Sequence, residues 1–194
     1  MFTSPIMHYF YLLLILFFCS CAKKETPRQK NAILSIQEMG ELATVEYTVT
    51  KIIKASDNKT WFKVGDRKIL MTCEATIKAG IDLSKISEKN FKIDGKNVTL
   101  TLPPPKVISL SMPPEKIETG YEEVSQLRDK FSSAEKDRLA MQAEQQIKNS
   151  IDSLGILLQA KANTAMLVHN LLKQLGYENI TIIHADDTKQ SILQ

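Results

Sequence analysis

Side chains able to act as nucleophiles, general bases or metal ligands are scarce in this sequence. It contains three cysteines and three histidines, and beyond the first 22 residues only Cys73, His169 and His184 remain. A catalytic thiol needs a neighbouring base or a helix N-terminus that lowers its pKa. Because histidine is so rare here, we expect Cys73 to be a small buried hydrophobic residue on a strand.

The two histidines make weak metal-site candidates. His169 falls within the apolar stripe of an expected helix, with no second histidine or carboxylate three or four residues further on, so it is expected in the core or at its edge. His184 precedes Ala185-Asp186-Asp187 in an expected tail, where ordering the chain would cost about 1–2 kcal/mol per residue. The sequence therefore predicts no catalytic residue, no metal site and no cofactor.

The first residues are expected to form an export signal. No charged residue occurs from Phe2 to Ala22, and Tyr9 to Phe18 (YFYLLLILFF) is apolar throughout. A run of about ten residues is shorter than the roughly 20 that a membrane span needs, but it suits the core of a signal peptide. The run ends in Cys19-Ser20-Cys21-Ala22, which resembles a bacterial lipobox, in which a cysteine after a small residue is lipidated.

The small Ser20 makes Cys21 the better candidate, since the bulky Phe18 precedes Cys19. We therefore expect residues 1–20 to be removed and Cys21 to carry lipid, as palmitate-type acyl chains. This predicts a protein held on a bacterial membrane with its domain facing the periplasm. The alternative is an uncleaved anchor helix over Ile6–Ala22, with Lys23 and Lys24 beside the membrane and the domain in the cytoplasm.

Composition bounds the rest of the chain. The 194 residues are 43% hydrophobic and 24% charged, with a formal net charge of +3. This is ordinary globular composition, and the length after the signal suits one domain. Basic residues form no block, so no nucleic-acid partner is expected. We expect a tether at 21–31, a single domain at 32–184 and a disordered tail at 185–194.

Period-two alternation marks the strands. It is clearest over Leu42–Ile53, and a second strand is expected over Lys68–Ala79. Asp94-Gly95 predicts a tight hairpin between two further strands. Shorter strands are expected at 33–36, 61–64, 107–110 and 179–183, with a turn at 55–59. The prolines at 103–105 end a strand and favour a stiff connector.

The last third changes to helical period. Ser132 and Glu135 form a capping-box pattern, and a stripe from Leu139 through Ala143 and Ile147 follows. Gly155 predicts a break, and Gly176 the end of a second helix. The second stripe is Leu158, Ala162, Ala165, His169 and Leu172, widened by Met166, Val168 and Leu175. Together these predict an α+β fold: an antiparallel sheet of about five to seven strands packed with a C-terminal helical pair.

Three segments carry a family resemblance. KILMTCEATIKAGIDLSKI, VTLTLPPPKVISL and AEQQIKNSIDSLGILLQAKANTAMLVHNLLKQLGYENITI resemble the bacterial domain-of-unknown-function family numbered 4230, over about residues 40–184. The shared residues are structural. The resemblance implies anchoring at a bacterial membrane and an uncharacterised activity.

Two functions follow as hypotheses. The first is a membrane-tethered, non-enzymatic module of the cell envelope that binds a protein or other ligand. The second is a hydrolase or metal-dependent enzyme whose site is assembled from scattered residues. An enzyme would show a concave pocket lined by Cys73, His169 or Asp82, whereas a binding module would show an open apolar surface. Asp82 itself is expected in a turn or cap, and Glu122 and Glu123 in a polar linker.

Overall fold

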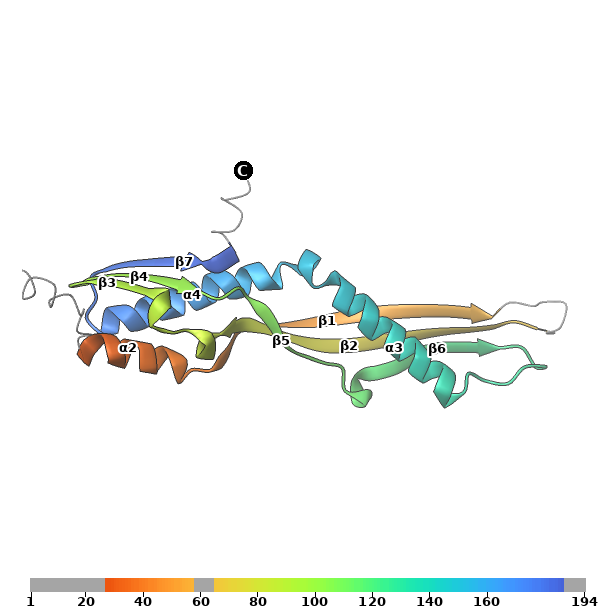
Figure 1. The fold of residues 1–194 in the computed structure, drawn as a ribbon. Helices are drawn as coiled ribbons and strands as arrows, with labels where there is room; N and C mark the ends of the chain where they lie inside the picture. The colour runs from red at the N-terminus through yellow and green to blue at the C-terminus, as the bar shows by residue number, and fades with distance from the viewer. Residues whose placement is uncertain (1–26, 58–64, 187–194) are drawn as a thin grey trace, which may run out of the picture.

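The computed structural model describes residues 27–57 and 65–186, and these form seven strands and three α-helices. The described elements form an elongated molecule, with helix α2 (Pro27–Gln37) at one end and the far ends of two long paired strands at the other (Figure 1). In chain order they are α2 (Pro27–Gln37), β1 (Glu41–Asp57), β2 (Arg67–Asp82), η1 (Leu83–Lys85), η2 (Glu88–Asn90), β3 (Phe91–Asp94), β4 (Asn97–Leu102), β5 (Lys106–Ser111), η3 (Pro114–Lys116), β6 (Ile117–Val124), α3 (Ser133–Ser150), η4 (Asp152–Leu154), α4 (Ile156–Gln174) and β7 (Asn179–His184).

The long hairpin of β1 and β2 is the main structural element of the molecule. The two strands pair antiparallel over their whole length, from Glu41 opposite Asp82 to Asp57 opposite Arg67, with one bulge between Ala43 and Val45. Gly80 lies opposite the bulge. A Cβ there would lie 1.7 Å from the carbonyl oxygen of Leu42, so only glycine fits. β2 thus continues through Gly80 to Asp82, beyond the expected end of the strand at Ala79.

A four-stranded sheet forms around this hairpin. β5 and β6 pair in succession with the other side of β2, both antiparallel. β6 was not predicted, because most of its side chains are polar and exposed, and it includes Glu122 and Glu123, which were expected in a linker. The expected turn at 55–59 was also wrong, since β1 extends to Asp57. The expected strand at 61–64 lies outside the described residues.

A second, three-stranded sheet covers the other end. β3 and β4 form the predicted Asp94-Gly95 hairpin, and β7 joins β4 in parallel. The predicted α+β class is confirmed, but the strands divide between two sheets and one pair is parallel. The prolines at 103–105 carry the chain from β4 in one sheet to β5 in the other, which confirms the expected connector.

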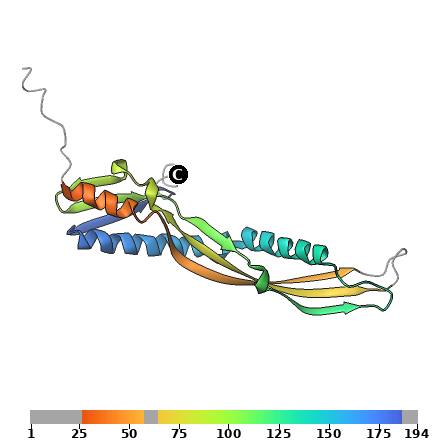
Figure 2. The same ribbon diagram turned by 90° about the horizontal axis from the view of Figure 1, so that it is seen from below.

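α3 and α4 form the predicted C-terminal pair and lie along one face of the sheets (Figures 1 and 2). Ser132 caps α3, and its side chain and that of Glu135 complete the predicted capping box. Gly155, with φ of 69°, separates the two helices as predicted.

The face that α4 buries differs from the predicted stripe. Leu158 and Met166 are 72% and 64% exposed. The buried residues are Ile156, Ala160, Thr164, Val168 and Leu172. The small Ala160 and Thr164 bring α4 close to β1, where the Thr44 hydroxyl lies 3.1 Å from both the Ala160 carbonyl and the Thr164 hydroxyl. Val168 and Leu172 belong to the predicted stripe, but Ala160 and Thr164 do not, and their close packing against β1 leaves Leu158 and Met166 exposed.

The expected strand at 33–36 is also wrong, because α2 covers it and begins inside the segment expected to be a tether. Ala32, Ile33 and Ile36 are buried. Their spacing puts them on one side of a helix, facing Leu83, Leu100 and Leu172 in the largest hydrophobic cluster. Three smaller clusters continue beneath α3 and the first turns of α4.

Candidate functional site

Cys73 is a fully buried strand residue, as predicted. It lies on the helix-facing side of β2 with Ile53 and Ala143, and Met112, Ile117 and Leu139 pack against this cluster. Burial raises the pKa of the thiol, which favours the unreactive protonated form. Neither histidine belongs to this cluster.

The two histidines lie apart from Cys73. His169 is half-buried on α4. His184 is the last residue of β7, opposite Leu102 of β4, and is only 6% exposed. It belongs to the folded sheet and not to a mobile tail. Asp186 forms a 3.0 Å ion pair with Lys161. Across residues 27–57 and 65–186, no three His, Cys, Asp or Glu side chains gather in a way that could hold a metal ion.

Cys21, the predicted lipidation residue, lies outside the described residues. None of the helices in the described part of the chain is both long enough and apolar enough to cross a membrane.

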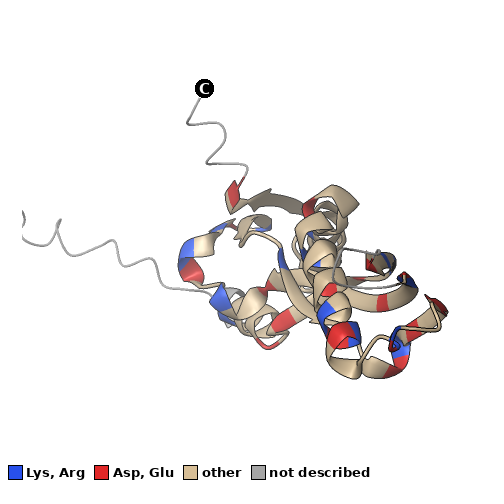
Figure 3. Ribbon diagram, turned by 90° about the vertical axis from the view of Figure 1, so that its right-hand side faces the viewer, with Lys and Arg blue, Asp and Glu red and all other residues tan. Residues whose placement is uncertain are grey.

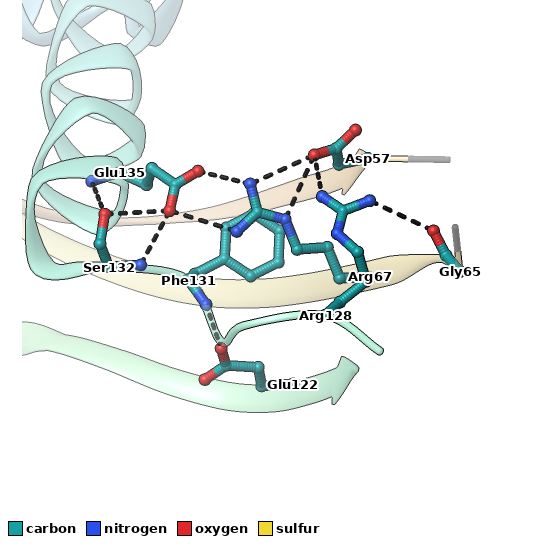
Figure 4. A network of polar contacts seen from close by, with 8 residues as sticks. All are labelled: Asp57, Gly65, Arg67, Glu122, Arg128, Phe131, Ser132 and Glu135. Carbon is teal, nitrogen blue, oxygen red and sulfur yellow. Dashed lines mark hydrogen bonds and ion pairs between the residues drawn. The ribbon is translucent and has the colours of Figure 1, made fainter. Parts of the chain in front are cut away.

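The densest polar cluster lies at the far end of the long sheet, where β1, β2, the segment after β6 and α3 meet (Figure 4). Arg67 pairs with Glu135 at 2.5 Å and with Asp57 at 3.2 Å. Arg128 pairs with the same Asp57 oxygen at 2.6 Å and donates to the carbonyl of Gly65. The guanidinium of Arg67 also lies 4.3 Å from the centre of the Phe131 ring.

These contacts shift the pKa values of several side chains in and near the cluster. The hydrogen bond from Arg67, with that from the Ser132 amide, lowers the pKa of Glu135 to about 2. The same ion pair with Glu135 raises the pKa of Arg67. Nearby, Lys136 lowers the pKa of Glu122, which also accepts a hydrogen bond from the Phe131 amide. These pKa shifts hold Glu135, Arg67 and Glu122 in their charged forms. The cluster therefore fastens α3 to the sheet and offers no poised acid or base.

A second charged cluster lies where the two sheets meet. Asp82 is 7% exposed and accepts a hydrogen bond from the Ser84 hydroxyl at 2.6 Å. Lys85 and Lys106 each approach its other oxygen at 3.2 Å. The Ser84 hydrogen bond, and then the two lysines, lower the pKa of Asp82 to about 2. Asp82 is thus a fixed anion that ends β2 and precedes η1, and its side chain makes no capping hydrogen bond to that helix.

Two shallow grooves lie near α2 and α4. One, of about 300 Å³, runs between α2 and η2 and includes Lys30, Leu34 and Lys89. The other, of about 450 Å³, follows α4. It is lined by the apolar Met39, Met166, Leu167 and Leu171 and by the side-chain amides of Asn163, Asn170 and Gln174. Neither is lined by Cys73, His169 or Asp82.

Sequence reasoning singled out Glu135 as a capping residue but missed its partners. Asp57, Arg67 and Arg128 come from β1, β2 and the segment after β6, and only the pairing of β2 with β1 and with β6 brings them together. The signal that could have found Asp57 and Arg67 is that one ends a strand and the other begins the next, so the two residues pair at the closed end of the hairpin. Opposite charges on paired strands attract each other, and an acidic side chain in the first turn of a helix is stabilised by the helix dipole.

Surface charges are interspersed. Seen from the hairpin end, lysine and arginine alternate with aspartate and glutamate around the molecule (Figure 3). Two ion pairs among them are Lys78 of β2 with Glu46 of β1 at 3.2 Å, and Lys116 of η3 with Glu74 of β2 at 2.8 Å.

The fold and these contacts define an α+β domain in which a long antiparallel sheet and a short mixed sheet share the helix α4. The chain belongs to the family described as Protein of unknown function (DUF4230), whose model matches residues 34–182. Comparisons with curated proteins and with solved structures found no match.

Proposed function

We propose that this chain is a lipoprotein of the bacterial cell envelope, held on the membrane by acyl chains on Cys21, whose domain binds a protein or other envelope ligand on the periplasmic side. The N-terminal sequence supports the anchor. A run of about ten apolar residues is short for a membrane span, and it ends in a cysteine that follows a small residue. The structure contributes the position of α2, which lies at one end of the elongated domain (Figure 1).

The binding role rests on one observation, the apolar groove along α4. Met166 is 64% exposed and Leu167 is 38% exposed, and both line the groove with Met39 and Leu171. Flexible methionine side chains adapt to apolar partners, and exposed apolar surface of this kind marks interaction sites. The charged side chains of the two clusters described above, in contrast, form ion pairs with one another.

The anchor is tested by labelling bacteria that express the full chain with radioactive palmitate. The parent chain and a Cys19→Ser variant are expected to incorporate label and to shorten on export. A Cys21→Ser variant is expected to incorporate none and to keep its full length. If Cys21→Ser incorporates label and shortens as the parent does, the lipoprotein proposal is wrong. A parent chain that neither incorporates label nor shortens would favour the uncleaved anchor helix.

The binding role is tested with a photo-crosslinking amino acid introduced at one position of the full chain. Met166 in the groove is compared with Met141 on α3, which is 60% exposed and lies outside it. We expect a discrete crosslinked product in cells from position 166 and not from position 141. Equal products at both positions, or none at 166, would argue against the groove as a binding surface.

A further inference from the structure

The two edges of the long sheet differ in a way that points to self-association. The edge formed by β5 and β6 is interrupted: η3 and the prolines 113 and 114 separate the two strands, and each pairing with β2 contains a bulge. Prolines and bulges of this kind prevent an edge from pairing with another chain.

The opposite edge, formed by β1, is regular. Near its start α4 covers it, because the Asn163 side chain donates a hydrogen bond to the carbonyl of Thr44 at 2.9 Å. From Glu46 to Asp57 the strand pairs with β2 without a bulge and contains no proline. In the described part of the chain no strand pairs with its outer side. An edge of this length leaves a row of backbone donors and acceptors open to another strand.

The side chains of this segment are self-complementary. On the face away from the helices, β1 exposes Glu46, Thr48, Thr50, Ile52 and Lys54 in succession. The acidic residue and the basic residue lie at equal distances in sequence from Thr50, and Ile52 is 55% exposed. Two copies of β1, antiparallel and centred on Thr50, would place each Glu46 opposite the partner's Lys54.

Other registers lack this match. A centre at Thr48 or Val49 puts Glu46 opposite an uncharged residue. A centre at Lys51 puts two lysines opposite each other, which is unfavourable. Centring on Thr50 places Lys51, which is half-buried on the helix side, opposite Val49 of the second copy. It also pairs β-branched residues across the strands, because Thr50 meets Thr50 and Thr48 meets Ile52.

We therefore propose that two copies of this chain join through β1, residues 46–54, to form a closed two-fold dimer with one continuous sheet. The interface is isologous, so each contact occurs twice. The two α2 helices lie at opposite ends of this dimer. The proposal does not depend on the lipid anchor, since it concerns only the folded domain.

Cysteine crosslinking tests the register directly. Thr50→Cys and Thr48→Cys are made in the full chain, in bacterial membranes and after purification in detergent, and oxidised with copper phenanthroline. Opposed residues in antiparallel strands have Cα atoms about 4.5–5.5 Å apart, within reach of a disulfide. The two Thr48 positions would lie about 13 Å apart, which is too far. We expect a disulfide-linked dimer from Thr50→Cys and only the parent's background from Thr48→Cys.

Charge reversal provides a second measurement on the Thr50→Cys background. Lys54→Glu alone replaces two attractive pairs across the interface with two repulsive ones, and should lower dimer formation on the order of tenfold. Glu46→Lys should lower it too, and also removes the pair of Glu46 with Lys78 within the chain. Combining both reversals restores the attraction and should restore crosslinking. Thermal unfolding of each variant shows that it is folded.

The proposal is overturned if Thr50→Cys crosslinks no more than Thr48→Cys, or if Thr48→Cys crosslinks better, which would require another register. It is also overturned if folded single and double reversals crosslink alike, or if the folded full chain sediments as a monomer at micromolar concentration.

Discussion

Replacing Gly80 with alanine probes the close approach of β1 and β2 on which the long hairpin depends. The added methyl carbon would lie 1.7 Å from the carbonyl oxygen of Leu42 and 2.9 Å from the Cα of Ala43. These are backbone atoms, so they can move only if the strands separate at the bulge. Overpacking costs about 1–3 kcal/mol, and each backbone hydrogen bond lost adds about 1 kcal/mol. We expect Gly80→Ala to lower the free energy of unfolding by about 3–5 kcal/mol.

Gly120→Ala is the matched control, because it places the same methyl group on a neighbouring strand. There the nearest atom is Cδ2 of Leu70, at 3.4 Å, and this flexible side chain can adjust. Alanine also loses about 0.5–1 kcal/mol less than glycine when a strand orders. Urea unfolding of both variants in the full chain, followed by circular dichroism, compares them. Equal losses for Gly80→Ala and Gly120→Ala would refute the close-approach reasoning.

The remaining predictions concern the charged cluster, the thiol and the helix face. The pKa of Glu135 is lowered from 4.5 to about 2, so its stabilisation is complete above about pH 5 and is lost as the pH falls towards 2. Urea unfolding at a series of pH values should show a shallower acid loss for Glu135→Gln than for the parent, and identical slopes would contradict the ion pair. The buried Cys73 thiol should react with a maleimide at least tenfold faster in denaturing urea than in buffer, and fast labelling of the native chain would show that it is accessible. Leu172→Ala should cost about 2–5 kcal/mol in thermal or urea unfolding, but Leu158→Ala, on the exposed face, less than about 0.5 kcal/mol. The reverse order would show that Leu158, and not Leu172, lies in the core, and would contradict the buried face of α4.

Local signals in the sequence predicted local structure well. The capping residues Ser132 and Glu135, the break at Gly155 and the hairpin at Gly95 are each specified by a few neighbouring residues. The alternation of β1 was also clear, since one side of that strand packs against helices and the other faces solvent. The α+β class followed from strands that precede helices along the chain.

The errors arose where tertiary contacts decide which element a segment forms and which face of it is buried. Residues 33–36 were expected to form a short strand because the segment is short and mostly apolar. The spacing of Ala32, Ile33 and Ile36 instead suits a helix that packs on the core. β6 carries too few apolar residues to be recognised, and its pairing with β2 holds it in place. On α4, the approach of Ala160 and Thr164 to β1 decided the buried face, which no single-helix pattern contains.

The candidate site was predictable only in part. The expected burial of Cys73 could be inferred from its lone occurrence on a strand. The cluster of Asp57, Arg67 and Arg128 could not, because these residues are brought together by strand pairing across the hairpin and by the segment after β6. The groove on α4 was missed for the same reason as the buried face, since its exposed Met166 was expected in the core.

The measurement that tests the proposed anchor most directly is the intact mass of the chain purified from bacterial membranes. The proposal predicts a protein that begins at Cys21 and carries the added mass of its acyl chains. A mass that corresponds to the unmodified chain from Met1 to Gln194 would contradict it.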